Sequence, residues 1–373
     1  MSEERRGPEE RRSPAFLRWM GNAAGALVFP LIAVLISFVI GAIIMLATGN
    51  NPIVAFGALF RGAFGSPLAI GRTLLNATPL IFTGLAVAVA FRAGLFNIGG
   101  EGQFYIGAIT AAVLGVSIGS FGVLGMVIAL AGCVVTGFLW GAIPGFLKAY
   151  FGAHEVITTI MLNFVAIYLA TYLALNPFRS EGLVPGTEAI DLAARIPFIG
   201  AGLGRANYGF VFGLVAAAVV YLFLWRTKRG FELRAVGLSP GAASYAGMHI
   251  GLNTVLALAI GGSLAALGGG EEVLGVYGKM SIPFVQNLGF NGIGVALLGR
   301  NHPVGVVFGA ILFGGMISGA QEMQFETDVP LQLASVLLAV ILLLVTATKL
   351  VELIAGKRAR AFAGARLEKG LGQ

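Results

Sequence analysis

The chain contains 373 residues, of which 57% are hydrophobic and only 11% are charged. Soluble domains carry about 25% charged residues, so this composition excludes an ordinary soluble domain. The formal net charge of +7 needs no nucleic-acid partner, because membrane proteins concentrate lysine and arginine on their cytoplasmic side.

Apolar runs long enough to cross a bilayer of about 30 Å recur along the sequence. They lack the two-residue alternation of barrel strands, so we predict an all-α, polytopic membrane protein with about ten transmembrane helices, some short or broken. In chain order these lie at about 24–47, 73–91, 100–117, 121–148, 155–175, 208–225, 250–268, 284–299, 303–320 and 331–349. The third and eighth are short and rich in glycine, so they are the least certain to be full spans. The segment 51–67 is expected to form a short helix on the outer membrane surface.

The distribution of basic residues predicts the orientation. If the chain starts in the cytoplasm, most of the 24 lysines and arginines fall in cytoplasmic segments, as the positive-inside rule requires. Both termini are therefore expected in the cytoplasm. We divide the chain into a cytoplasmic N-terminal tail (1–22), a transmembrane domain (23–350) with a cytoplasmic segment at about 226–249, and a basic cytoplasmic C-terminal tail (351–373).

Glycines spaced by four indicate close helix packing. Gly137, Gly141 and Gly145 form one ridge on the fourth span, and Gly315 and Gly319 form another on the ninth. Helices associate in lipid through close backbone contact, so such ridges predict helix crossings.

Polar residues interrupt the apolar sequence in "FRAGLFNIGGEGQFYIGA" (91–108). Asn97, Glu101 and Gln103 stand among closely spaced glycines, which disfavour a helix interior. Irregular backbone is tolerated at membrane depth only where it lines a cavity or is buried in protein. Two interpretations stay open: a broken or re-entrant helix that meets something polar, and an ordinary cytoplasmic turn in which Glu101 begins the next helix, where the helix dipole favours an acid.

A second polar group lies in "HEVITTIMLNFVAIYLATYLA" (154–174). Glu155, Thr159 and Asn163 are spaced by four and so share one helix face. Polar residues within a span usually face a cavity or a partner. Asn163 lies deeper than Glu155 and is the better cavity candidate, although an interhelical hydrogen bond explains it equally well.

A third polar group lies in "FVQNLGFNGIGVALLGRNHPVG" (284–305), where Asn287 and Asn291 are spaced by four. Its "GFNGIG" echoes "LFNIGG" at 95–100. An internal repeat would explain the echo, and many transporters place their sites between repeats, but two short matches can also arise by chance.

The cytoplasmic segment "RTKRGFELRAVGLSPGAASYAGMHI" (226–250) begins with basic residues, breaks at Ser239-Pro240-Gly241 and continues as a short helix-like piece. A connection of this length usually has a function or a partner. A plain solvated connection is the alternative.

Several catalytic motifs are missing from the sequence. Gly278-Lys279 is followed by Met280, so the phosphate-binding motif GxxxxGK[ST] does not occur there or elsewhere. The three histidines do not stand at metal-ligand spacing. We therefore expect no ATP hydrolysis, no metal site and no catalytic residue in this chain.

Four stretches resemble the permease subunits of bacterial ABC importers: "FRAGLFNIGGEGQFYIGA", "HEVITTIMLNF", "RAVGLSPGAASYAGM" and "GFNGIGVALLGRNHPVG". The similar branch includes branched-chain amino acid, ribose-type sugar and nucleoside systems, and the resemblance covers roughly 70–350. The first two stretches are most similar to the nucleoside permeases, often named simple-sugar permeases. The acidic, serine-containing motif that ribose-type members tend to carry at the first site is absent.

The resemblance implies a multi-pass permease of the bacterial inner membrane that carries nucleosides by alternating access. Its partners would be two cytoplasmic ATPase subunits that bind ATP, a second permease (identical or similar) and an external substrate-binding lipoprotein. The chain itself would need no cofactor.

The candidate substrate pathway comprises Asn97, Glu101, Gln103, Thr159, Asn163, Asn287 and Asn291. The resemblance also implies ATPase coupling at 234–247, for which the candidates are Arg234, Ser239, Pro240, Ala242, Ala243, Tyr245 and Gly247. The alternatives are a simple sugar or branched-chain amino acid as cargo, or an ion-coupled carrier in which Glu101 and Glu155 titrate.

Overall fold

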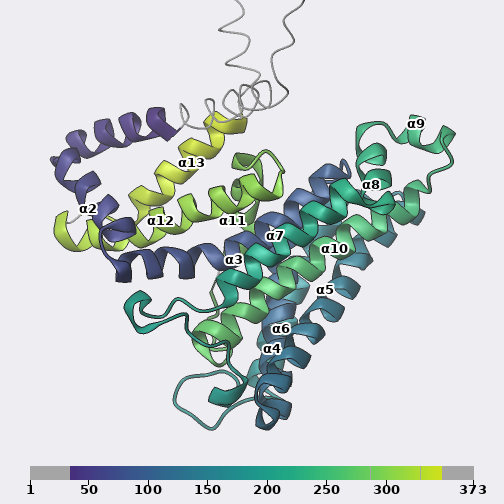
Figure 1. Cartoon of the computed structure of the whole chain (residues 1–373), viewed down its shortest axis with the longest axis horizontal. Helices are drawn as coiled ribbons and strands as arrows, with labels where there is room; N and C mark the ends of the chain where they lie inside the picture. The colour runs from purple at the N-terminus through teal and green to yellow at the C-terminus, as the bar shows by residue number, and fades with distance from the viewer. Residues whose placement is uncertain (1–33, 286, 328, 347–373) are drawn as a thin grey trace, which may run out of the picture.

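The computed structural model describes residues 34–346 except Gln286 and Asp328 (Figure 1). The predicted tails 1–22 and 351–373 lie outside the described residues. The same holds for 24–33 of the first expected span and 347–349 of the last. Within the described part the chain is helical, and no β-strand forms.

The helices follow one another in a simple order. The first described helix is Val34–Ala47. It is followed by α2 (Pro52–Phe64), α3 (Pro67–Arg92), α4 (Gly100–Ile118), α5 (Val123–Phe151), α6 (Glu155–Leu175), α7 (Gly209–Arg226), α8 (Lys228–Leu238), α9 (Pro240–Tyr245), α10 (Ile250–Glu271), α11 (Leu288–Leu298), α12 (Pro303–Thr327) and α13 (Gln332–Thr346). A π-helical turn, Glu272–Tyr277, extends α10. The long connection between α6 and α7 contains two short 3-10 helices, Leu192–Ala194 and Ala201–Leu203.

Seven of the described helices are long and apolar enough to cross a membrane, and they include the glycine-rich third span. This confirms the polytopic, all-α prediction. The eighth expected span is wrong in length, because α11 has 11 residues where a spanning helix needs about 20. Its helix begins only after Asn287, whose backbone is left-handed with φ of 69°.

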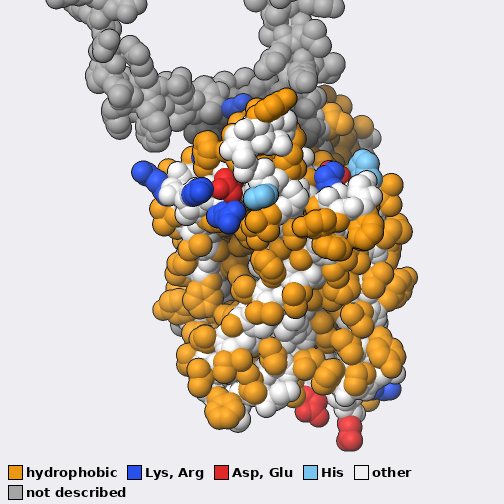
Figure 2. Space-filling view, turned by 90° about the vertical axis from the view of Figure 1, so that its right-hand side faces the viewer, with side chains coloured by type: hydrophobic (Ala, Val, Ile, Leu, Met, Phe, Trp, Pro, Cys, Tyr) orange, Lys and Arg blue, Asp and Glu red, His pale blue; other side chains and the backbone are white. Residues whose placement is uncertain are grey.

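The flank of the molecule is covered by hydrophobic side chains, as a protein surrounded by lipid requires (Figure 2). Lysine, arginine and histidine side chains gather at the upper end in this view, which is the end that carries α8 and α9 (Figures 1 and 2). The helix α3 runs through the centre and is the most buried of the candidate spans.

Both predicted glycine ridges make close helix crossings. A Cβ on Gly141 would lie 2.3 Å from the Leu258 carbonyl oxygen of α10, so only glycine permits this approach of α5 to α10. A Cβ on Gly319 would lie 2.2 Å from the Leu59 carbonyl oxygen, which brings α12 equally close to α2. These contacts confirm the packing prediction and fix α10 and α12 against their neighbours.

Candidate translocation and coupling sites

The connection between α3 and α4 (93–99) is irregular backbone that is partly buried: Gly94 and Phe96 are exposed, whereas Ala93, Leu95, Asn97 and Gly99 are buried. Asn97 holds it together: its Oδ1 accepts a hydrogen bond from the Gly99 N–H at 2.9 Å, and its Nδ2 donates to Gln103 Oε1 at 3.2 Å. Asn97 and Gln103 are both buried. The connection is thus a turn between two helices whose polar side chain, that of Asn97, is enclosed by protein.

Asn163 fastens α6 to this turn. Its Nδ2 donates to the Ile98 carbonyl oxygen at 2.8 Å, and its Oδ1 accepts from the Gly102 N–H at 2.8 Å. A helix leaves its first N–H groups without partners in the helix, so Asn163 supplies one for α4. Thr159, one turn away on α6, is buried and donates to the Glu155 carbonyl oxygen.

Glu101 plays the same role for α11. Its two carboxylate oxygens accept hydrogen bonds from the N–H groups of Asn287 and Gly289, at 2.7 and 2.8 Å. A carboxylate at the start of a helix also interacts favourably with the helix dipole. Glu101 is only 2% exposed, so it joins the beginnings of two helices deep inside the protein.

The two echoing sequences therefore meet in space. A Cβ on Gly289 would lie 2.2 Å from the Glu101 nitrogen, so the starts of α4 and α11 touch through backbone. We call this group of buried side chains the helix-start cluster; it comprises Asn97, Glu101, Gln103, Thr159 and Asn163. The remaining pathway candidates lie at its edge, Asn287 exposed and Asn291 partly buried.

Glu155 lies apart from the helix-start cluster, at the beginning of α6. It forms an ion pair with Lys148 of α5 at 2.5 Å, and His154 Nδ1 lies 3.8 Å from the same oxygen. Its carboxylate therefore has a lysine partner and a neighbouring histidine at the start of α6.

The coupling candidates form two short helices that project from the bundle (Figure 1). Ser239 caps α9 by accepting the Ala242 N–H at 3.4 Å, and Pro240 occupies the first turn. Tyr245 is 98% exposed, whereas Ala243 is only 3% exposed. Gly247 ends the segment with φ of 78°, a left-handed conformation that favours glycine. The expected helix 234–247 is thus divided, with Arg234 in α8 and the remaining candidates in or beside α9.

Arg234 ties α8 to the bundle. Its Nε donates to the Leu224 carbonyl oxygen at 2.9 Å, and its guanidinium lies 5.4 Å from the Trp225 ring centroid. His302, between α11 and α12, packs against the same ring at 4.9 Å. Burial and the nearby Arg92 guanidinium lower the pKa of His302 below its usual value. This stack connects α8 with the loop that follows α11.

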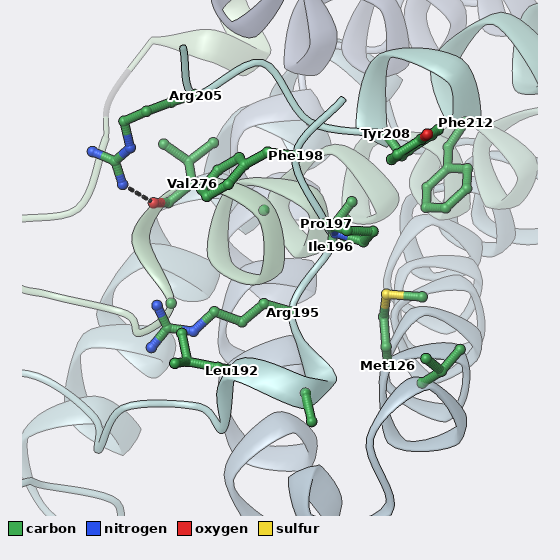
Figure 3. Close-up of a pocket in the computed structure, with 14 residues that line it drawn as sticks. Met126, Leu192, Arg195, Ile196, Pro197, Phe198, Arg205, Tyr208, Phe212 and Val276 are labelled. Carbon is green, nitrogen blue, oxygen red and sulfur yellow. Dashed lines mark hydrogen bonds between the residues drawn. The ribbon is translucent and has the colours of Figure 1, made fainter. Parts of the chain in front are cut away.

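At the opposite end, under the connection between α6 and α7, lies a cavity of about 660 Å³ (Figure 3). Arg195 and Arg205 stand on one side of it, and Met126, Tyr208 and Phe212 stand on the other (Figure 3). None of these residues belongs to the candidates identified from the sequence.

Two buried acids in "GGGEEV", near the end of α10, were also not among the residues selected from the sequence. Glu271 and Glu272 are both buried, and Glu271 lies beside the Asn207 carboxamide. Acidic residues within a long apolar run were the available signal, since they are rare inside membrane spans.

Comparison with known proteins decides the family. A family model described as "Branched-chain amino acid transport system / permease component" matches residues 69–346. The chain belongs to this permease family. It is therefore an integral, multi-pass protein of the inner membrane and a transporter subunit.

Three relatives match over most of their length. The guanosine ABC transporter permease protein NupP of Bacillus subtilis is 38% identical over 334 residues, which are 89% of this chain and 96% of the relative. The nucleoside ABC transporter permease protein NupB of Lactococcus lactis is 35% identical over 91% of this chain and 95% of its own. The glucose ABC transporter permease protein TsgB13 of Haloferax volcanii is 32% identical over 84% and 85%.

A second permease from each of the two bacteria is more distant. NupQ of Bacillus subtilis, also named a guanosine ABC transporter permease protein, is 24% identical over 66% of this chain and 80% of its own. NupC of Lactococcus lactis, named a nucleoside permease, is 26% identical over 69% and 86%. No solved structure matches the chain.

Proposed function

We propose that this chain is one of two non-identical permease subunits of an ATP-driven nucleoside importer. The observation that carries the proposal is the similarity to NupP, whose name assigns it to guanosine transport and which aligns over 96% of its length. NupB, named for nucleosides, supports the same class of cargo.

The pattern of identities supports a heteromeric pair. In Bacillus subtilis the chain is 38% identical to one guanosine permease and 24% identical to another. The Lactococcus lactis pair shows the same contrast, 35% against 26%. The chain is therefore the counterpart of NupP and NupB, and its partner is a second permease of the NupQ and NupC kind.

ATP is bound by partner subunits in this proposal. The exposed helix α9 presents Tyr245 to the solvent, and an exposed aromatic residue on a projecting element suits insertion into a groove of a partner protein. The ATPase subunits dock there. The external binding lipoprotein delivers the cargo at the opposite end, where the long connection between α6 and α7 lies.

Movement enters the membrane domain through α8. Arg234 and Trp225 link α8 to the end of α7, and Trp225 also contacts His302 beside α11. Displacement of α9 by the ATPases shifts α11 relative to α4 and breaks the hydrogen bonds between Glu101 and the start of α11. The amides of the helix-start cluster then become able to hydrogen-bond a neutral, hydroxyl-rich cargo.

A simple sugar is the second candidate cargo, because the relative named as a glucose permease is 32% identical. Sugars and nucleosides share hydroxyl groups, so the cluster amides suit either. An ion-coupled carrier has less support. Glu101 is engaged by two backbone N–H groups and Glu155 by Lys148, so each carboxylate has a structural partner.

Uptake measurements test the proposal. Cells that express the ATPases, the lipoprotein and the second permease are compared with and without this chain for uptake of labelled guanosine and uridine. We expect uptake that depends on this chain and is blocked by unlabelled nucleosides but not by glucose or leucine. Chain-dependent uptake of labelled glucose, with no uptake of nucleosides, would replace the proposed cargo by a sugar.

A further inference from the structure

Two cavities lie in line along the same three helices. The larger cavity, of about 660 Å³, and a smaller one, of about 300 Å³, share Phe212 in their walls. On α5 the larger cavity touches Met126 and the smaller one Leu130; on α10 and its π-helical extension the larger touches Gly275 and the smaller Leu267. The order is the same on each helix, so the two cavities follow one another along these helices and adjoin at Phe212; we call the two together the groove.

The groove is apolar over most of its length. The smaller cavity is lined by Phe82, Leu130, Phe212, Val215, Ala216, Val219, Val220, Leu264 and Leu267, together with Glu271. The carboxyl oxygens of Glu271 are themselves buried, so the groove meets the hydrocarbon stem of this residue. From Phe212 to Val220 the α7 wall extends about 12 Å, at about 1.5 Å per residue. A groove of this shape suits a hydrocarbon chain.

Two arginines line the larger cavity, at one end of this groove (Figure 3). Arg195 donates through Nε and Nη2 to the Ile190 carbonyl oxygen, at 3.0 and 2.9 Å, and Arg205 donates through Nη2 to the Val276 carbonyl oxygen at 2.8 Å. These carbonyls hold the guanidinium groups in place but do not neutralise them. Across residues 34–346, with the two stated gaps, no carboxylate forms an ion pair with either arginine.

The position of the arginines relative to the membrane also matters. The larger cavity lies where α7 begins and α10 ends, whereas α8 and α9 connect the other ends of these two helices. The arginines therefore lie at the level of the outer headgroups if α8 and α9 are cytoplasmic. Apolar side chains continue from that level towards the middle of the bilayer.

We infer that this groove binds a membrane phospholipid with an anionic headgroup. The phosphate and headgroup interact with Arg195 and Arg205, because guanidinium groups match phosphate oxygens in geometry and charge. One acyl chain runs past Phe212 into the smaller cavity. A nucleoside or a sugar is uncharged and would leave both arginines without a counter-charge, so the proposed cargo fits this groove less well than a lipid.

Native mass spectrometry of the complete, purified importer tests the inference. After delipidation, the complex is titrated with phosphatidylglycerol or with zwitterionic phosphatidylcholine of the same acyl chains. We expect phosphatidylglycerol to be retained preferentially. The double variant Arg195→Gln/Arg205→Gln should lose this preference, roughly fivefold for each arginine removed.

Two further variants keep the test informative. Arg179→Gln removes an exposed arginine from the same connection but outside the groove, and it should retain the full preference. Ala216→Phe fills the smaller cavity but leaves both arginines in place, and it should weaken the binding of both lipids. The thermal stability of each variant is compared with that of the wild type, so that a misfolded protein is recognised.

Several outcomes would overturn the inference. An unchanged preference in the double variant would show that lipid charge is sensed elsewhere, as would an equal loss in Arg179→Gln. Displacement of phosphatidylglycerol by millimolar inorganic phosphate would show a simple anion site without a role for the groove. Displacement by guanosine would assign the groove to the cargo instead of to lipid.

Discussion

Glu101 illustrates how one side chain can define a joint between helices. It bonds to the first N–H groups of α11 from a position at the start of α4. Replacement by alanine leaves these N–H groups, of which that of Gly289 is buried, without an acceptor, and we expect a loss of about 2–4 kcal/mol in folding free energy. Glu101→Gln keeps one acceptor oxygen and should lose less. Thermal unfolding of the purified protein in detergent measures both.

Glu181→Gln is the matched control for the Glu101 variants, because Glu181 is an exposed acid on the connection between α6 and α7. It should unfold at the wild-type temperature. If Glu101→Ala were as stable as this control, the carboxylate would not hold α11 in place.

His302 gives the folding stability a predictable dependence on pH. Its pKa is lowered in the folded protein, so the unfolded chain binds more protons at pH values around and below 6.5, the usual histidine pKa. Stability should therefore fall as the pH decreases from about 7 towards 5. His302→Phe retains the ring beside Trp225 and should reduce this dependence.

The measurement is the unfolding temperature at pH 7.5 and pH 5.5. His249→Phe serves as the control, since His249 is exposed at the start of α10, and it should behave as the wild type. An identical pH dependence in the wild type and in His302→Phe would refute the assignment.

At the scale of helices, the contact between the starts of α4 and α11 depends on the absence of a side chain. Gly289→Ala would place a Cβ 2.2 Å from the Glu101 nitrogen, and such overpacking should cost about 1–3 kcal/mol. Gly251→Ala is the control, because the nearest atom would be 3.6 Å from its Cβ. Equal unfolding temperatures for the two variants would contradict the close contact.

The short helix α9 is the other element with a specific expectation. Tyr245→Ala removes a side chain that is 98% exposed, so the permease should fold normally while transport and cargo-stimulated ATPase activity fall at least tenfold, as for truncation of an interface hot spot. Ala243→Asp is a poorer test because Ala243 is buried. Ser244→Ala, an exposed neighbour on α9, should have little effect. Normal transport by Tyr245→Ala would exclude α9 as the coupling element.

Much of the element pattern could be predicted from the sequence, since apolar length identifies most spans and four-residue glycine spacing identifies their crossings. The eighth span was recognisable as short from its sequence, but the residue at which α11 begins could not be predicted in this way. Its beginning depends on the left-handed backbone of Asn287 and on the carboxylate of Glu101, which accepts hydrogen bonds from a position far away in the sequence. Such long-range partners leave no periodic signal in the local sequence.

At the scale of the whole molecule, the sequence indicated which polar residues matter but not how they are used. Asn97, Glu101, Gln103, Thr159 and Asn163 were selected as polar residues in an apolar context, and the structure brings them together. It also shows them bonded mainly to backbone and to one another. The groove with Arg195 and Arg205 could not be foreseen, because it arises from segments far apart in the chain.

The most direct test of the account is transport by the purified importer in proteoliposomes that contain both permeases, the ATPases and the binding lipoprotein. We expect labelled guanosine to accumulate with ATP but not with a non-hydrolysable analogue, and we expect this accumulation to require both this chain and the second permease. Accumulation without ATP, driven by an imposed proton or sodium gradient, would contradict it and identify an ion-coupled carrier.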